Sequence, residues 1–419
     1  MNALTQQFKR ASGLSRNAKL FLALTAINGL GNGAFMLFFN LFVLARGNDE
    51  AFLGLLMSAM SLAAVILGLP MGILADRMGR KQALMMSMFL SLAAIMLLLL
   101  SPGDWPLVLA AIGLGASNAL WMATGPAFMA ENSISEERPT LFSLQSAVGT
   151  LVAFAGAALG GPLPALFAGL LGVEPEGVTA YRVTLLVAAA TMALALVPLA
   201  LVQQQARRTG VGTEGKPQGL SLRSLTRPDM LRLLGPQLII GLGAGLLIPY
   251  LNIFFKERFA VSDSALGVIF AVSQLLVGVA TLATPLLAER WGKVRTVVGT
   301  QLASLPFLMA LGFVPVLPVA VGSFWTRAAL MNMGSPLYTA FAMEQVREEE
   351  RGQAGALLGL AWSVGQGIGP GISGVVQTRV GFPPLFLTTG ATYLLAALLL
   401  QAFFGQTERR AAAEAGAIV

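Results

Sequence analysis

The chain has 419 residues, of which 56% are hydrophobic and only 11% are charged. Because a soluble domain carries about 25% charged residues, this composition excludes an ordinary soluble protein and indicates one built into a membrane. The sequence contains no cysteine and no histidine, so it lacks thiolate chemistry and the usual general base of an intramembrane hydrolase. We therefore predict that the protein is not an enzyme and has no catalytic residue, no metal site and no cofactor.

The apolar runs of the chain are continuous and long enough to cross a membrane. A bilayer core needs about 20 apolar residues per helix, and continuous rather than alternating apolar residues favour helices over strands. The first run, residues 20–45, is longer than the apolar core of a signal peptide, so we predict a retained helix. Twelve spanning helices are predicted, at residues 19–46, 50–76, 80–101, 104–132, 139–171, 178–203, 231–256, 263–289, 293–313, 315–344, 352–379 and 383–406.

A polar stretch rich in Gln, Arg, Gly and Pro interrupts this series after the sixth helix. Its composition is typical of a flexible linker. We therefore predict an N-terminal six-helix bundle at 1–203, a cytoplasmic linker at 204–230 and a C-terminal six-helix bundle at 231–419.

The two predicted bundles resemble each other in sequence. The segment INGLGNGAFMLFFNLF, from Ile27, aligns with IIGLGAGLLIPYLNIF, from Ile239. LADRMGR, from Leu74, aligns with LAERWGK, from Leu287, so the offset stays near 212–213 residues across several helices. Because each unit has an even number of crossings, both point the same way, which predicts a parallel repeat about a pseudo-twofold axis along the membrane normal. The predicted fold class is an all-α membrane protein of two related six-helix bundles.

Most of the 27 Lys and Arg residues fall on one side of the predicted membrane, the side of both termini and the linker. Loops rich in Lys and Arg face the cytoplasm. We therefore predict an integral protein of the bacterial inner (plasma) membrane with both termini cytoplasmic. The net charge of +7 is then a topology signal, and we expect no nucleic-acid partner.

The loop after the second predicted helix carries GILADRMGRK, residues 72–81. Its acidic residue lies near the bilayer edge, where a charge needs a partner; a plain loop of solvated charges is the alternative interpretation. The stretch resembles motif A of the major facilitator superfamily, which runs roughly G-x-L-x-D-R-x-G-R-R/K. The resemblance implies a twelve-helix secondary transporter with a degenerate second copy of the motif. The matching residues are Gly72, Asp76, Arg77, Gly79 and Arg80 in the first copy and Glu289, Arg290 and Lys293 in the second.

A second charged pattern follows the fourth and tenth predicted helices. Six residues separate Glu131 from Arg138, and six separate Glu344 from Arg351. This pattern resembles the E-x6-R element of sugar porters, which engages motif A on the cytoplasmic face. We expect opposite charges at neighbouring helix ends to hold that face shut, as a two-state cytoplasmic gate that substrate binding biases.

Arg327 lies near the middle of the tenth predicted helix, where a charge is costly and usually faces a cavity or a partner. All Asp and Glu residues fall close to helix ends or in loops, so the sequence predicts no buried counter-ion for it. We interpret Arg327 as a residue that binds an anionic ligand group; a structural role between helices is the alternative. The other candidate substrate-binding residues are polar or aromatic side chains within helices: Asn28, Asn32, Asn118, Trp121, Gln237, Tyr250, Asn332, Trp362 and Gln366. Amides at such places can instead join helices by hydrogen bonds.

These observations predict a secondary transporter that moves a small amphipathic or anionic organic molecule by alternating access. Export is preferred, because GQGIGPGISG, residues 365–374, resembles the glycine-rich motif C of exporters, although exporters carry it in helix five and this chain in helix eleven. An uptake permease or uniporter for a metabolite or sugar is the first alternative, and a lipid translocator or receptor on a transporter fold is the second.

The expected partners are the small-molecule substrate and membrane lipid, and we expect a monomer. Proton coupling is left open. The carboxylates placed to carry a proton are Asp76, Glu131, Glu289 and Glu344.

Overall fold

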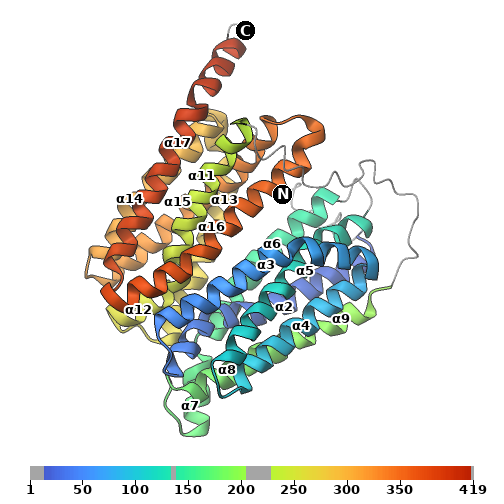
Figure 1. Ribbon diagram of the computed structural model, residues 1–419, viewed down its shortest axis with the longest axis vertical. Helices are drawn as coiled ribbons and strands as arrows, with labels where there is room; N and C mark the ends of the chain where they lie inside the picture. The colour runs from blue at the N-terminus through green and yellow to red at the C-terminus, as the bar shows by residue number, and fades with distance from the viewer. Residues whose placement is uncertain (1–13, 134–137, 204–227, 417–419) are drawn as a thin grey trace, which may run out of the picture. The chain divides into compact units, whose positions relative to one another are not determined.

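The computed structural model describes residues 14–133, 138–203 and 228–416, and over these ranges the chain is helical and contains no strand (Figure 1). The first half of the chain contains α2 (Arg16–Ala45), α3 (Glu50–Met78), α4 (Arg80–Leu100), α5 (Trp105–Glu131), α6 (Arg138–Gly160), α7 (Leu163–Leu171), α8 (Val178–Leu194) and α9 (Leu196–Leu201). The second half contains α11 (Pro228–Leu247), η1 (Ile248–Tyr250), α12 (Leu251–Phe259), α13 (Asp263–Trp291), α14 (Lys293–Phe313), α15 (Leu317–Glu344), η2 (Glu348–Glu350), α16 (Arg351–Val380) and α17 (Pro383–Gly416).

Contacts divide these residues into two compact units. The first comprises Met1–Arg207 and Phe255–Leu275, and the second comprises Arg208–Phe254 and Leu276–Val419. The start of α13 belongs to the first unit, where it packs on α6: a Cβ on Gly267 would lie 2.6 Å from the carbonyl oxygen of Ala157. The predicted linker lies outside the described residues except for its last three positions, which begin α11.

Local sequence signals set several helix ends. Asp49 caps α3 by accepting a hydrogen bond from the backbone N–H of Phe52. Gly79 joins α3 to α4 at φ +92°, and Gly292 joins α13 to α14 at φ +87°. A residue with a side chain adopts such angles only with strain, so glycine permits the tight turn at the same place in both repeats.

Glycines also let helices approach closely. A Cβ on Gly33 of α2 would lie 2.9 Å from the Cα of Gly156 on α6, and one on Gly369 of α16 would lie 2.6 Å from the Cα of Gly245 on α11. The glycines around GLGNG are therefore packing residues, which bring backbones together as small residues do in membrane bundles.

The same helix pairs recur in both halves. In the first half α2 packs on α6 and α8, and α4 packs on α5 and α8. In the second half α11 packs on α16 and α17, and α14 packs on α15 and α17. The offset between the two sequence repeats relates each pair of the first half to one of the second. The helices concerned are labelled in Figure 1.

Ten helical segments of the described ranges are long and apolar enough to cross a membrane. α15 and α16, with 28 and 30 residues, are also long enough. They are less apolar because α15 carries Arg327 and α16 is rich in glycine. The all-α, twelve-helix prediction is confirmed, with local differences. The predicted helix 139–171 breaks before Pro162, and the predicted helix 231–256 changes to 3-10 geometry around Pro249, because proline removes a backbone donor.

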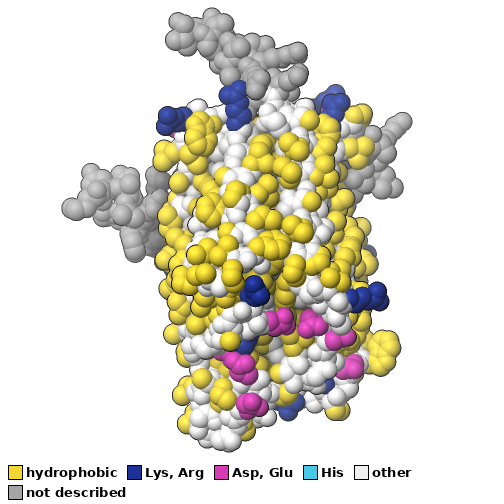
Figure 2. Space-filling view, turned by 90° about the vertical axis from the view of Figure 1, so that its left-hand side faces the viewer, with side chains coloured by type: hydrophobic (Ala, Val, Ile, Leu, Met, Phe, Trp, Pro, Cys, Tyr) yellow, Lys and Arg dark blue, Asp and Glu magenta, His cyan; other side chains and the backbone are white. Residues whose placement is uncertain are grey.

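The exposed surface is that of a protein surrounded by lipid. Figure 2 shows a broad field of hydrophobic side chains, with charged side chains gathered above and below it. Ile66 and Leu282 are 70% and 81% exposed, as expected for residues that face acyl chains rather than water.

Candidate functional site

Each compact unit contains a cavity, and all the predicted substrate-binding residues except Tyr250 line one or the other. The first cavity, about 330 Å³, is lined by residues of the first unit. The second, about 520 Å³, is lined by residues of the second unit. Both volumes lie within the usual range for small-molecule sites, about 300–1,000 Å³.

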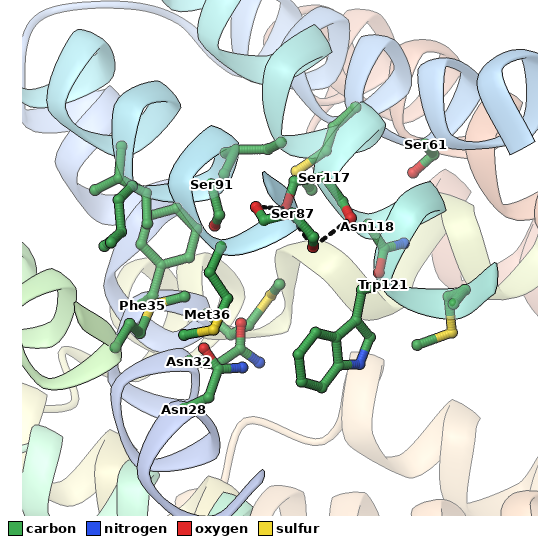
Figure 3. Close-up of a pocket in the computed structure, with 17 residues that line it drawn as sticks. Asn28, Asn32, Phe35, Met36, Ser61, Ser87, Ser91, Ser117, Asn118 and Trp121 are labelled. Atoms are coloured by element: carbon green, nitrogen blue, oxygen red, sulfur yellow. Dashed lines mark hydrogen bonds between the residues drawn. The ribbon is translucent and has the colours of Figure 1, made fainter. Parts of the chain in front are cut away.

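The first cavity brings together Asn28 and Asn32 on α2 with Asn118 and Trp121 on α5, as Figure 3 shows. The two asparagines of α2 are four residues apart and so share one helix face. Serines of α4 and α5 bond at its wall: Ser87 Oγ donates to the carbonyl of Ser117 at 3.0 Å, and Ser117 Oγ donates to the carbonyl of Ser87 at 2.8 Å (Figure 3). These two hydrogen bonds hold α4 against α5 next to Asn118, which follows Ser117 in the chain.

The lining of the first cavity is uncharged. Besides the amides and hydroxyls, it contains the methionines Met36, Met60, Met88, Met122 and Met192. Methionine is flexible and polarizable and adapts to irregular apolar shapes. The cavity therefore suits a neutral ligand group with apolar surface and a few hydrogen-bonding positions.

The second cavity contains a buried charge. Arg327 of α15 is 3% exposed, and its Nη2 donates to the Tyr393 hydroxyl of α17 at 2.8 Å. The guanidinium also lies 5.6 Å from the centre of the Tyr393 ring, within cation–π range. Among the residues that the structure describes, no carboxylate pairs with Arg327, and its Nε has no hydrogen-bond partner. The prediction that it has no buried counter-ion agrees with this geometry.

Amides and an indole complete this cavity. Gln237 of α11, Asn332 of α15, and Trp362 and Gln366 of α16 line it with Arg327. The glycines of α11 place α16 here: a Cβ on Gly241 would lie 2.5 Å from the carbonyl oxygen of Trp362, and one on Gly245 would lie 2.6 Å from that of Gln366. Asn332 Nδ2 donates one hydrogen bond to the carbonyl of Ala328 in its own helix. Contact of these residues with a ligand stays a prediction.

Tyr250 lies elsewhere. It is fully buried, and its hydroxyl donates to the carbonyl of Pro370 at 2.8 Å. This bond joins η1 to α16, so Tyr250 contributes to helix packing.

Charged residues of the predicted gate meet at helix ends within each half. Arg80, at the start of α4, contacts Asp76 of α3 at 2.7 Å and Glu131 of α5 at 3.0 Å. Lys293, at the start of α14, forms the equivalent ion pair with Glu344 of α15. The sequence repeat thus places the same contact at the same corner of both halves.

The remaining predicted gate residues take other positions. Arg77, Glu289 and Arg290 are exposed. Arg351 donates to the carbonyl of Met343 at 3.2 Å, and Arg138 begins α6. An added Cβ on Gly72 would meet only Ala123, at an ordinary 4.0 Å. A role for this set as a gate stays a prediction.

The sequence interpretation missed one ionic group built around a buried carboxylate, which we call the Lys256 cluster: Glu176, Tyr181, Lys256 and Asp263, all in the first unit. The ammonium of Lys256 lies 2.6 Å from Asp263, 2.8 Å from Glu176 and 3.0 Å from the Tyr181 hydroxyl. The Asp263 side chain is only 5% exposed. Because these residues stand at helix ends, they looked like loop charges. The available sequence signal was a lysine and an aspartate seven residues apart, on either side of the short connection between two predicted helices.

A family model described as Major Facilitator Superfamily matches residues 21–236 and again residues 233–418. No curated protein sequence matches the chain. Among solved structures, the chain is similar to a bacterial homologue of the human lysosomal transporter Spinster in an inward-facing, unoccupied conformation. The TM-score is 0.74 at 16% identity, over 94% of this chain and 96% of that one. It is also similar to the nucleoside transporter NupG, with a TM-score of 0.70 at 15% identity over 93% of this chain and 99% of that one. The chain therefore belongs to the major facilitator superfamily and is a transporter, not an enzyme.

Proposed function

We propose that the protein is a secondary active transporter that moves a small amphipathic or anionic organic molecule by alternating access, with Arg327 as the residue that binds its anionic group. The observation that carries the proposal is Arg327 itself: a buried guanidinium, lining a cavity, without a carboxylate partner among the described residues.

The physical argument is the cost of that charge. An ionised side chain away from water is costly unless it is paired or faces a polar cavity. The Tyr393 hydroxyl satisfies one N–H but brings no negative charge. A ligand anion would supply it, and the guanidinium fork suits a carboxylate or phosphate oxygen pair.

Direction and topology belong to the same proposal. We place both termini on the cytoplasmic side because Lys and Arg concentrate there, and we favour export over uptake because of the motif C-like segment 365–374. Proton coupling is one option. The carboxylates predicted to carry it, among them Asp76 and Glu131, are largely exposed, whereas Asp263 is buried.

Transport by purified protein in liposomes tests the proposal. A panel of labelled organic anions and neutral analogues is offered to wild type, Arg327→Ala and Arg327→Lys. We expect an anion to move with wild type, and its apparent affinity to fall at least about 30-fold in Arg327→Ala, as for a loss of 2 kcal/mol or more. Arg327→Lys keeps the charge without the planar fork and should lie between the two.

The direction is read in everted, acidic-inside vesicles. An exporter that exchanges substrate for protons makes the vesicle lumen more alkaline when its substrate is added. Transport of neutral solutes alone, unchanged in Arg327→Ala, would contradict the anion-binding role. Movement of labelled lipid with no solute transport would instead favour a lipid translocator.

A further inference from the structure

Three residues of the second cavity are polar where their repeat equivalents in the first cavity are apolar. At an offset of 213, Gln301 of α14 corresponds to Met88 of α4, and Arg327 of α15 corresponds to Leu114 of α5. Both members of each pair line their cavities. At these positions the second half is the polar one, whereas on the first helix of each half the reverse holds: Asn28 and Asn32 correspond to Ile240 and Ala244.

Tyr393 is the third such residue, and its equivalent is identified by packing. A Cβ on Gly243 of α11 would lie 3.0 Å from the Tyr393 ring, and one on the equivalent Gly31 of α2 would lie 2.5 Å from the Met192 side chain. Met192 and Tyr393 both line their cavities. Equivalent glycines thus make room for a methionine in one half and a tyrosine in the other.

These three residues leave hydrogen-bonding capacity unused. The Tyr393 hydroxyl accepts from Arg327, and within the described part of the chain its own hydrogen has no acceptor. Arg327 Nε and Gln301 Oε1 are buried without partners. Gln301 is 7% exposed and Arg327 3% exposed, and both line the second cavity. Buried polar groups normally find a partner, and here a ligand is the partner that the cavity can admit.

Within the function proposed above, on which this step rests, we propose that Arg327 and Tyr393 form one oxyanion-binding site contained in the second half, that the Tyr393 hydroxyl donates directly to the ligand anion, and that Gln301 Oε1 accepts from a hydrogen-bond donor elsewhere on the same ligand. A phenol that accepts from a guanidinium directs its hydrogen away from it, so an anion can receive from both groups at once. The carboxamide of Gln301 contacts the substituent beside the anion. The ligand class is an organic carboxylate or phosphate monoester.

Binding to the purified full chain tests this site without transport. The probes are benzoate, octanoate and phenyl phosphate, with benzamide as the neutral match for benzoate, and the readout is concentration-dependent thermal stabilisation in detergent. Wild type should be stabilised by at least one of the anions and not by benzamide. The variants are Arg327→Leu and Gln301→Met, which install the first-half residues, and Tyr393→Phe, which keeps the ring and its packing.

Arg327→Leu should abolish the stabilisation. Tyr393→Phe should weaken it about tenfold, as expected for losing one hydrogen bond to a charged group. Gln301→Met should leave binding of these three probes unchanged, because none carries a donor for Gln301 Oε1, and should weaken binding of 3-hydroxybenzoate about threefold to tenfold. The control is Arg379→Leu, which removes an exposed positive charge at the end of α16 and should bind the probes like wild type.

The outcomes separate this site from the wider proposal. Wild-type affinity of Tyr393→Phe for benzoate together with wild-type affinity of Gln301→Met for 3-hydroxybenzoate overturns the three-residue site, and loss of anion binding in Arg327→Leu would then still support the proposed function. Equal stabilisation of wild type by benzoate and benzamide, or no response to any of the three anions, overturns the oxyanion site itself.

Discussion

At the scale of single residues, the Lys256 cluster shows how much a buried charge depends on its partner. Asp263 is held by an ammonium at 2.6 Å and by the Tyr181 hydroxyl at 3.3 Å. Lys256→Met removes the ammonium and leaves the carboxylate buried, which costs about 3–5 kcal/mol in comparable buried pairs. We expect a clear fall in the free energy of unfolding, measured by denaturation in detergent.

The chain offers two matched controls for this prediction. Arg258→Met removes an exposed positive charge two residues away and should change stability by less than about 0.5 kcal/mol. The double variant Lys256→Met with Asp263→Asn removes both charges and should recover much of the loss. A single variant Lys256→Met as stable as wild type would show that the pair contributes nothing.

At the residue level, the sequence predicted which polar side chains lie within helices or meet at helix ends, while their roles in binding and gating stay predictions. A charge in the middle of an apolar helix identified Arg327, and the offset between the repeats identified Arg80 with Glu131 and their equivalents in the second half. Tyr393 could not be found in this way, because a lone aromatic residue in an apolar helix resembles any core residue. The hydrogen bond that it accepts from Arg327 follows only from the packing of α17 within the second half.

At the scale of helices, Gly369 of α16 and Gly245 of α11 form one of the close contacts of the second half. Gly369→Ala places a methyl group 2.5 Å from the carbonyl carbon of Gly245, against backbone that cannot rotate away. Overpacking of this kind costs about 1–3 kcal/mol. Gly359→Ala, on the same helix, meets no atom within 4 Å and should be neutral or stabilising by up to about 1 kcal/mol.

Thermal unfolding of the two alanine variants in one detergent compares them directly. Equal melting temperatures would mean that the close approach of α11 and α16 does not constrain the fold. The comparison also bears on the second cavity, since this contact positions the helix that carries Trp362 and Gln366.

At the scale of the whole molecule, the repeat explains why so much of the fold was predictable. Apolar runs of spanning length predicted the helices, and one constant offset predicted that the two halves repeat, because equivalent glycines and equivalent charges recur in both. Which helices pack on one another came only from the structure. Helix breaks were less predictable: Pro162 and Pro249 interrupt helices within otherwise apolar runs. The repeat itself indicates where function has diverged, since the first cavity is neutral where the second is charged.

The last prediction concerns the balance between conformations. The ion pairs of Arg80 with Asp76 and Glu131 are largely exposed, so each contributes at most about 1 kcal/mol to stability. A change of about 1 kcal/mol nevertheless alters a two-state ratio about fivefold. Asp76→Asn and Glu131→Gln should therefore leave the melting temperature nearly unchanged and alter the accessibility of the cavities.

Because the sequence has no cysteine, Ser335→Cys in the second cavity gives a single labelling site. We expect its rate of reaction with an impermeant maleimide to change at least threefold in either variant. Asp229→Asn, which removes an exposed partner of Arg232, should leave the rate as it is. Unchanged labelling in both variants would contradict a cytoplasmic gate at these helix ends.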